Sequence, residues 1–268
     1  MLTAAGVVLA GGRSSRMGQS KAWLEWHGST LLHRAAAILA RSVDGPVVVV
    51  AAPGQELPPL PRDVTVVEDP VEGRGPVQGL AVGLAAVADR AEAAFVCSTD
   101  MPFLHPAFVR RVLRGLAPGV DVALPVARGF RQPLAAGYRT SLVPLVERLL
   151  AEGALRPGML FERCEVARLT EEELLADADL ARLDPTLESV VNVNSPEDYA
   201  AARDRPSPQV GEVRAATLGA AVAGLTSDRD VVITLNGVRV TLDEHMPLVA
   251  GDIVTVTGAG PGDSRVAP

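Results

Sequence analysis

The sequence predicts an α/β fold, a three-layer sandwich in which helices cover both faces of a mostly parallel β-sheet, followed by a small α+β unit. Two observations predict the large part: its short β-branched strands are apolar almost throughout, and segments with helical spacing alternate with them. Strands that are apolar on both faces belong in a sheet buried between helices. The composition agrees with a well-buried protein, since 48% of the 268 residues are hydrophobic.

Five strands and four helices make up the predicted sandwich. The strands are expected at residues 5–10, 47–51, 64–67, 94–98 and 121–124. The helices are expected at residues 30–41, 78–88, 106–116 and 141–151. In the first helix, Leu31, Ala35 and Ile38 fall on one stripe behind a Ser29/Thr30 cap. Alternation of strand and helix is the pattern of a parallel sheet.

The chain divides into two predicted domains. Residues 205–212 form a linker, because Pro206 and Pro208 exclude a helix there and no apolar periodicity is present. The large domain spans residues 1–204 and the small one residues 213–268. In the small domain a helix is expected at residues 218–225 and strands at 231–235, 238–242 and 252–257, the first two joined by Asn236-Gly237, a strong hairpin signal.

Composition excludes several classes of protein. A net charge of -7, with no run of basic residues, argues against nucleic-acid binding. Cys97 and Cys164 are too few for a disulfide framework and lack the spacing of a zinc site, which suits a reducing cytoplasm. No apolar segment reaches the roughly 20 residues that cross a membrane. We therefore expect a cytoplasmic protein that binds neither nucleic acid nor membrane.

Lysine use is unusual. Of the 25 basic residues only Lys21 is a lysine, and the rest are arginine. A genomic preference for arginine explains the many arginines but not the exception. Lysine presents a compact, mobile point charge, so a site that holds phosphates through one ammonium resists replacement by arginine. We favour the functional interpretation.

The segment that contains Lys21 predicts a phosphate-binding loop. It reads LAGGRSSRMGQSK over residues 9–21 and begins where the first strand ends. Gly11 and Gly12 allow backbone N–H groups to face an anion, and Arg16 and Lys21 add positive charge. The spacing fits neither GxxxxGK[ST] nor GxGxxG, so another nucleotide-binding fold is indicated. The alternative is a glycine-rich turn with two solvated arginines.

This segment closely resembles the nucleotidyltransferase signature LxGGxSxRMGxxK, and within that superfamily the molybdenum cofactor guanylyltransferases (MobA-like). Three further motifs follow in order: Glu68-Asp69 before the GPVQG loop of residues 75–79, TDMP at residues 99–102, and NVNSPED at residues 192–198. The resemblance covers about residues 4–203. It implies a Rossmann-like sheet of the nucleotide-diphospho-sugar transferase type.

The resemblance also implies roles for particular residues. The backbone of Leu9, Ala10, Gly11 and Gly12 lines the base and ribose, Lys21 contacts the phosphates, and Asp69 with the loop from Gly75 to Gly79 holds the guanosine. Independently of the resemblance, the positive charge of Arg16 makes it a candidate catalytic residue together with Lys21.

Asp100 is the expected Mg²⁺ ligand. A carboxylate at the carboxyl end of a buried strand lies where open α/β sheets bind ligands, and hard oxygen suits this ion. The alternative, a cap for the helix near Pro106, is weaker because that helix begins too late.

Two further segments are candidates for the site. Asn192 and Asn194 alternate with valines, so a strand would direct both amides to one face; the alternative is an Asx turn and a helix cap before Pro196. The segment Arg131-Gln132-Pro133 resembles the acceptor side of the family, where arginine pairs a phosphate, and it reads equally as a surface turn.

The implied reaction transfers GMP from GTP to the terminal phosphate of molybdopterin and releases pyrophosphate, with Mg²⁺ as the cofactor. Ser20 departs from the family, which often has an acidic residue before the lysine. Alternatives are a cytidylyltransferase of the same cofactor, another small-molecule NTP transferase, or a non-catalytic assembly scaffold. Other molybdenum cofactor biosynthesis proteins or molybdoenzyme chaperones are expected protein partners.

The small domain resembles the β-grasp sulfur carriers, such as the small subunit of molybdopterin synthase. Its LNGVRV hairpin and AGDIVTV strand carry this resemblance. Those carriers end in a bare Gly-Gly, whereas this chain continues as GAGPG and then DSRVAP. We expect a degenerate carrier that serves as a docking or dimer module.

Overall fold

The computed structural model describes residues 2–11, 17, 20–71, 74–223, 231–258 and 264–266. Within this part of the chain the central sheet has eight strands, in the order β10-β7-β9-β6-β1-β4-β5 with β8 paired to β7. These strands are β1 (Ala4–Leu9), β4 (Val47–Ala51), β5 (Val64–Glu68), β6 (Ala93–Ser98), β7 (Val122–Ala127), β8 (Phe130–Arg131), β9 (Ala135–Arg139) and β10 (Val166–Leu169).

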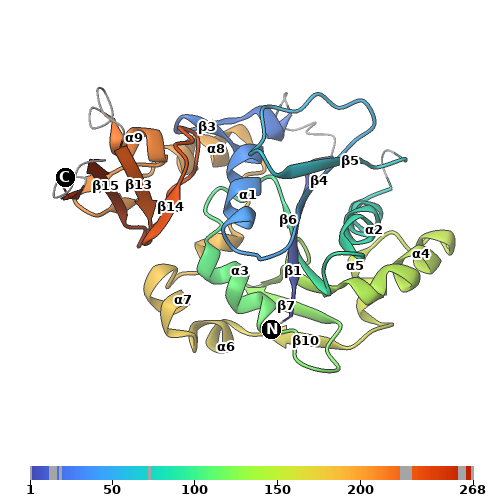
Figure 1. Ribbon diagram of the computed structural model, residues 1–268. Helices are drawn as coiled ribbons and strands as arrows, with labels where there is room; N and C mark the ends of the chain where they lie inside the picture. The colour runs from blue at the N-terminus through green and yellow to red at the C-terminus, as the bar shows by residue number, and fades with distance from the viewer. Residues whose placement is uncertain are drawn as a thin grey trace.

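Helices cover both faces of this sheet, as Figure 1 shows. They are α1 (Leu31–Ala40), α2 (Pro76–Val87), α3 (Pro106–Leu113), α4 (Val143–Ala151), α5 (Pro157–Phe161), α6 (Glu171–Leu175), α7 (Ala178–Leu183) and α8 (Pro196–Arg203), with 3₁₀ turns η1 (Lys21–Trp23), η2 (Thr140–Leu142) and η3 (Glu188–Val190). A short hairpin of β2 (Glu25–Trp26) and β3 (Ser29–Thr30) leads into α1.

The packing follows from the alternation of side chains along each strand. In β1, Val8 belongs to the core under α1 and α3, whereas Val7 belongs to the core under α2 and α4. Both are fully buried, because a strand buried on two faces sends successive residues to opposite layers. The predicted three-layer α/β sandwich is confirmed.

Two sequence predictions about the sheet were wrong. The strand β5 is not buried on both faces: it is the edge of the sheet, and Val66 is 45% exposed. The strands β9 and β10 were missed, and β9 lies antiparallel between β7 and β6. Ala135, Ala136 and Gly137 in β9 have weak strand preference, so pairing with both neighbours rather than local sequence makes this strand.

The C-terminal unit has a core of its own, which runs from Val210 to Val256. It contains β11 (Gln209–Val210), β12 (Val213–Arg214), α9 (Leu218–Val222), β13 (Val231–Leu235), β14 (Val238–Val240), β15 (Val254–Gly258) and β16 (Ser264–Val266). Its four-stranded sheet has the order β14-β13-β15-β16 and is antiparallel. Asn236 and Gly237 both have positive φ, as the predicted hairpin turn requires. The β-grasp resemblance stays a prediction.

The segment predicted as a linker, residues 205–212, contains the short strand β11. Val210 is 2% exposed, pairs with Val213 in a tight hairpin and joins the core of the C-terminal unit. Pro206 and Pro208 exclude a helix, as predicted, but they leave the next residues extended and able to pair.

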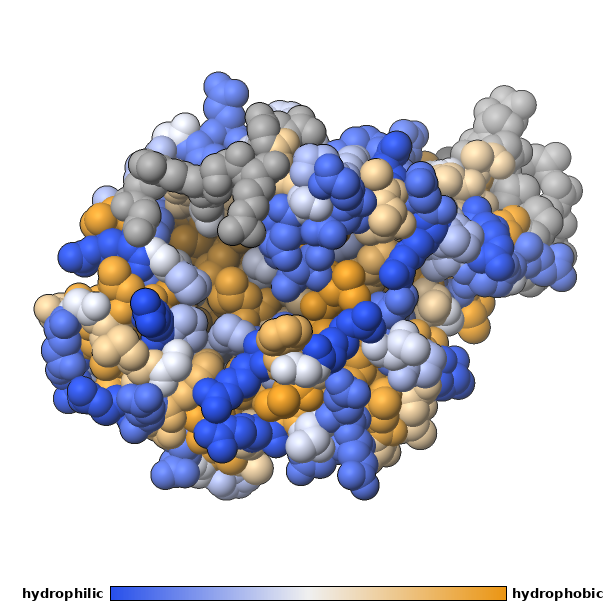
Figure 2. All heavy atoms as spheres, turned by 180° about the vertical axis from the view of Figure 1, so that it is seen from behind, coloured by the Kyte–Doolittle hydropathy of each residue, from blue (hydrophilic) through white to orange (hydrophobic). Residues whose placement is uncertain are grey.

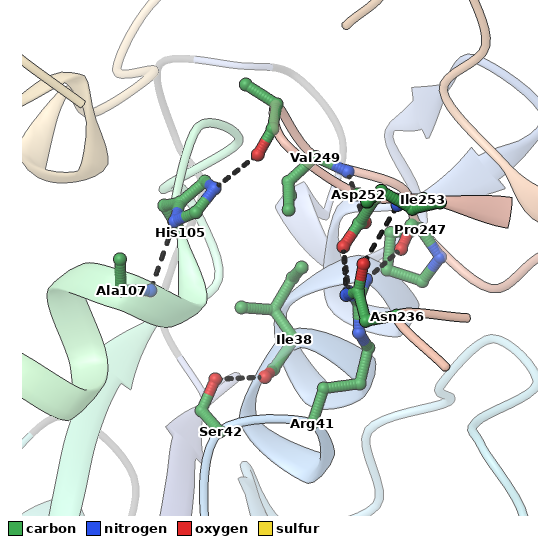
Figure 3. A network of polar contacts seen from close by, with 11 residues as sticks. Ile38, Arg41, Ser42, His105, Ala107, Asn236, Pro247, Val249, Asp252 and Ile253 are labelled. Atoms are coloured by element: carbon green, nitrogen blue, oxygen red, sulfur yellow. Dashed lines mark hydrogen bonds and ion pairs between the residues drawn. The ribbon is translucent and has the colours of Figure 1, made fainter. Parts of the chain in front are cut away.

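The C-terminal unit is attached to the end of α1 by polar contacts, shown in Figure 3. Arg41 donates to Asp252 Oδ1 at 2.5 Å and to the carbonyl oxygen of Pro247 at 2.7 Å. His105, at the start of α3, lies 3.0 Å from the carbonyl oxygen of Ala250. These contacts join segments more than 140 residues apart, and no motif in the sequence predicts them.

Candidate active site

The carboxyl ends of four parallel strands form one edge of the sheet. The strands β6, β1, β4 and β5 are neighbours and run parallel, so the residues that follow them lie in a row. The hydroxyl of Thr99 after β6 donates to the carbonyl oxygen of Leu9 at 3.2 Å, and Gln55 donates to the carbonyl oxygen of Ala10 at 3.1 Å. Open α/β sheets bind ligands at this edge.

Lys21 and Asp100 meet at this edge. The Nζ atom of Lys21 lies 2.8 Å from Oδ2 of Asp100, and the two side chains are 20% and 16% exposed. The same ammonium donates to Oδ1 of Asn194 at 3.1 Å. These three residues are far apart in sequence, and α/β topology brings them together. The close approach of Lys21 and Asp100 is the geometry that a shared cleft requires.

Ser98 completes the surroundings of Asp100. Its hydroxyl lies 2.5 Å from Oδ1 of Asp100, so each carboxylate oxygen has one partner. The backbone carbonyl of Asp100 accepts from the N–H of Val193 at 2.9 Å. Ser98 was not among the predicted site residues, although its place at the end of β6, two residues before the carboxylate, was a usable signal. The helix-cap alternative for Asp100 is wrong, because His105 caps α3.

Asn192 and Asn194 do not lie in a strand. Ser195 caps α8 through a capping box with Asp198, whose carboxylate also accepts from the backbone N–H of Asn194. The cap alternative therefore holds for Ser195, while the side chain of Asn194 turns to Lys21. A short non-helical segment before a cap leaves these amides available to the site.

A cavity of about 540 Å³ lies beside Asp100. Its lining includes Ser98, Asp100, Asn192 and Asn194 on one side. The segment after β7 supplies the other side with Arg128, Phe130, Arg131, Gln132 and Pro133. Arg131 is therefore an exposed residue of the hairpin β7–β8 that also borders the cavity. Figure 2 shows the opposite face of the molecule to Figure 1, where hydrophobic residues lie in a hollow with hydrophilic residues beside it.

The residues expected near the base are elsewhere on the same edge. Asp69 follows β5 and its carboxylate accepts from the N–H of Val71 at 3.0 Å. Gly75 has φ 77° at the start of α2, and a Cβ on Gly79 would approach the side chain of Leu9 to 3.3 Å. None of Asp69, Gly75 and Gly79 lines the cavity beside Asp100.

Gly11 also needs its small size, because a Cβ there would lie 3.2 Å from the backbone nitrogen of Ala52. Gly12 and Arg16 lie outside the described residues.

The ionisable groups near Lys21 and Asp100 offer neither a reactive nucleophile nor a histidine base among the described residues. Burial, and then the Asp100 carboxylate, raise the pKa of the Cys97 thiol, so Cys97 stays protonated and is a poor nucleophile. No histidine lines the cavity in the part of the chain that the structure describes. In the same part, no group of three or more His, Cys, Asp or Glu residues is placed to hold a metal ion by itself.

A membrane-spanning helix is also absent from the described ranges: none is both long and apolar enough.

Known proteins are similar to this chain in sequence and in fold. The family model of the MobA-like NTP transferase domain matches residues 6–166, more than half of the chain. A protein of Mycobacterium avium named "Probable molybdenum cofactor guanylyltransferase" is 37% identical over 189 residues, which are 67% of this chain and 94% of that protein. A protein of Mycobacterium tuberculosis with the same name is 40% identical over 169 residues, 62% of this chain and 82% of its own.

A solved structure named molybdopterin-guanine dinucleotide biosynthesis protein A, from Archaeoglobus fulgidus, has a TM-score of 0.59 and 23% identity. The similarity covers 75% of this chain and 97% of that one, and it shows a common fold.

Proposed function

The chain belongs to the MobA-like NTP transferase family, and from this membership we propose that it transfers GMP from GTP to the terminal phosphate of molybdopterin. It is a nucleotidyltransferase, and its relatives at 37% and 40% identity carry the name of guanylyltransferases of the molybdenum cofactor. The observation that carries the proposal is the pairing of Lys21 Nζ with Asp100 at 2.8 Å, beside a cavity at the edge of the sheet.

The triphosphate binds at the ends of β1 and β6. Lys21 contacts its phosphates, and the backbone from Leu9 to Gly12 lines the base and ribose. Arg16 adds positive charge, and Asp69 with the loop from Gly75 to Gly79 holds the guanosine. Lysine suits the phosphate position because its ammonium is a compact charge that reaches several oxygens in turn.

The oxygen atoms around Asp100 fit a Mg²⁺ ion. This ion is commonly held by one or two carboxylates together with substrate phosphates, rather than by a cage of protein ligands. Asp100 supplies the carboxylate, Ser98 places a hydroxyl oxygen against it, and the amide oxygen of Asn194 accepts from Lys21, which pairs with the same carboxylate. When bound, the ion neutralises the charge that builds on the phosphates.

The chemistry needs no base from the protein. An oxygen of the acceptor phosphate attacks the α-phosphorus of GTP, the bond from that phosphorus to the bridging oxygen breaks, and pyrophosphate leaves with the electron pair. A phosphate nucleophile is ionised near neutral pH, so no proton has to be removed. Lys21 stabilises the negative charge on the phosphoryl oxygens, which is where preorganised cations lower a barrier.

The acceptor occupies the cavity beside Asp100. Arg131 and Gln132 border it and can hold the phosphate and polar groups of molybdopterin. Asn192 lines the opposite side. This arrangement places the acceptor phosphate near the carboxylate that faces the nucleotide.

We extend the proposal to the setting of the enzyme. Residues 1–204 form the catalytic domain, and residues 213–268 form the small domain. The protein works in the cytoplasm, and it has other molybdenum cofactor biosynthesis proteins or molybdoenzyme chaperones as partners.

The test mixes the purified protein with GTP, Mg²⁺ and molybdopterin and measures pyrophosphate release. Lys21→Arg and Lys21→Met should each lower kcat about 100-fold or more, because arginine keeps the charge but not the compact shape. Arg90→Met, at an exposed position, should match the wild type. Turnover that survives Lys21→Met unchanged would exclude this mechanism.

A thermal-shift comparison of GTP, CTP and UTP tests the base. Selective stabilisation by GTP supports the guanylyltransferase, and selective stabilisation by CTP supports the cytidylyltransferase instead. Failure of every nucleotide to bind favours the assembly scaffold.

A further inference from the structure

A second cavity, of about 310 Å³, lies between the nucleotidyltransferase part and the C-terminal unit. We call it the interdomain cavity. Trp26, Phe103 and Arg34 line it from the large part, Pro206 and Pro208 from the connecting segment, and Val249 from the C-terminal unit. Its walls are thus mostly apolar and partly aromatic. It lies away from the Lys21–Asp100 pair, since it shares no lining residue with the cavity beside Asp100.

The walls of the interdomain cavity are held in place. Figure 3 shows His105 and Arg41 reaching from α3 and α1 to the segment that contributes Val249, where the carboxylate of Asp252 also accepts from the N–H of Val249 at 2.9 Å. On the other side, the rings of Trp26 and Phe103 meet edge to face at 5.6 Å. A cavity with fixed walls loses little entropy when it takes a ligand.

Arg34 lines the interdomain cavity and has few hydrogen-bond partners in the protein. The residue is only 7% exposed, on the inner side of α1. Its Nε donates to the carbonyl oxygen of Pro102 at 2.5 Å. Among the described residues, its two terminal nitrogens have no hydrogen-bond acceptor and no carboxylate within ion-pair distance. Arg34 lines the interdomain cavity, so its four remaining N–H donors can be reached by a partner that enters it.

The charge of Arg34 persists at neutral pH. Burial, together with repulsion from Arg41, lowers its pKa to about 10, and the Asp252 carboxylate, which acts in the opposite direction, offsets only part of this lowering. The guanidinium therefore remains protonated under ordinary conditions and presents a positive charge inside an apolar chamber. An anionic group would find there a planar fork of donors suited to two oxygens.

The other ionisable groups around the interdomain cavity already have partners. Arg205 pairs with Glu188 at 2.6 Å and lies over the ring of Phe103. The carboxylate of Asp184 accepts from the backbone N–H groups of Glu188 and Ser189. Neither Asp184 nor Glu188 forms an ion pair with Arg34. Among the described charged residues that line the cavity, Arg34 is therefore the one that can still pair with a ligand.

The two histidines that line the cavity are not anion partners. Burial is the largest cause that lowers the pKa of both His27 and His105, which favours their neutral forms. The Nδ1 atom of His105 accepts from the N–H of Ala107, and its Nε2 atom lies 3.0 Å from the carbonyl oxygen of Ala250.

We propose that the interdomain cavity binds a small organic carboxylate with a flat apolar body, whose carboxylate pairs with the terminal nitrogens of Arg34. The apolar body packs against Trp26 and Phe103. A monoanion matches the single open cation, whereas a phosphate monoester would bring a second negative charge close to Asp184 and Glu188. Nothing in the proposed transfer reaction uses this cavity.

Benzoate is the probe, and Trp26 is the reporter. The chain has two tryptophans, so Trp23→Phe leaves Trp26 as the single emitter. In the full-length protein, benzoate should change the Trp26 fluorescence in a saturable way. Benzamide has the same shape without the charge, and it should bind at least about tenfold more weakly.

Two variants assign the effect. Arg34→Met keeps the apolar stem and removes the cation, and it should weaken benzoate binding at least about tenfold. Arg90→Met makes the same change on the exposed surface and should leave benzoate binding unchanged. The comparison of benzoate with benzamide uses the unsubstituted Arg34, so the test stands even where Arg34→Met fails to fold.

Three results would overturn the proposal. They are the absence of saturation by benzoate, equal binding of benzoate and benzamide, and tighter binding of phenyl phosphate than of benzoate. The last result would make the interdomain cavity a phosphate site.

Discussion

Replacing Asp252 with alanine removes the carboxylate that joins the C-terminal unit to α1. This side chain is 4% exposed and accepts from Arg41 Nη2 at 2.5 Å, from Asn236 Nδ2 at 2.8 Å and from the N–H of Val249 at 2.9 Å. Removal of one partner of a buried ion pair costs about 3–5 kcal/mol. Arg41 is 17% exposed and keeps its bond to Pro247, so we expect the lower end, about 3 kcal/mol.

The loss should be local to the C-terminal unit. About 3 kcal/mol corresponds to roughly a hundredfold faster amide exchange by opening of that unit. Hydrogen exchange measured by mass spectrometry should therefore show faster exchange in β13 and β15, with α2 unchanged. The thermal transition of this unit should fall by about 12–24 °C, at about 4–8 °C per kcal/mol for a unit of this size.

Asp89→Ala is the matched control, since Asp89 is 80% exposed and its contact with Arg90 is 3.8 Å long. An exposed pair of this kind contributes at most about 1 kcal/mol. Equal thermal shifts for Asp252→Ala and Asp89→Ala would refute the view that a buried carboxylate attaches the unit. Unchanged exchange in β13 would refute it too.

Three further predictions concern positions nearer the sandwich. Ser98→Ala removes the hydroxyl that orients Asp100 and should lower kcat about tenfold with little change in the KM for GTP, as steady-state kinetics would show. Burial, as the largest cause, lowers the pKa of His105 from 6.5, so the unfolded chain binds more protons below about pH 6.5 and the folded state loses stability as the pH falls. His105→Asn keeps a cap for α3, and its melting temperature should fall less than that of the wild type between about pH 7.5 and 5.5. Gly83→Ala would place a Cβ 2.4 Å from Val7 Cγ1 and should cost about 1–3 kcal/mol in urea unfolding.

Apolar runs in the sequence were enough to predict most of the sandwich, because a strand that is buried on both faces has apolar residues almost throughout. The same rule failed at β5, which is apolar in sequence yet lies at the edge of the sheet with Val66 exposed. It also failed at β9, whose Ala135–Arg139 sequence of small residues carries no local strand signal. Position within a sheet depends on the order of the strands, and that order is a tertiary property.

The site divides in the same way. Lys21 and Asp100 were predicted because each stands in a recognisable motif at a strand end. Ser98 was missed, since a serine beside a strand end is common and only the geometry shows its hydroxyl at Asp100. The contacts of Asn194 were left open, because capping and site chemistry use the same residue types. Arg34 gave no signal at all: an arginine in an amphipathic helix is expected on the exposed face.

The cost of removing Lys21 and Arg34 from water is offset by different partners. This difference bears on the separate roles that we propose for them, phosphate binding for Lys21 and carboxylate binding for Arg34. The ammonium of Lys21 has a carboxylate at 2.8 Å and an amide oxygen at 3.1 Å, so the protein itself holds it in place before any phosphate binds. The guanidinium of Arg34 is more deeply buried, yet its one hydrogen bond is to the carbonyl oxygen of Pro102 among the residues that the structure describes. The Asp252 carboxylate offsets only part of the cost of burying this cation, since the pKa of Arg34 stays below the ordinary value, so a ligand that pairs with the guanidinium would lower the free energy further. A single carbonyl contact gives too small a structural return, and we therefore assign the remaining donors to an external carboxylate.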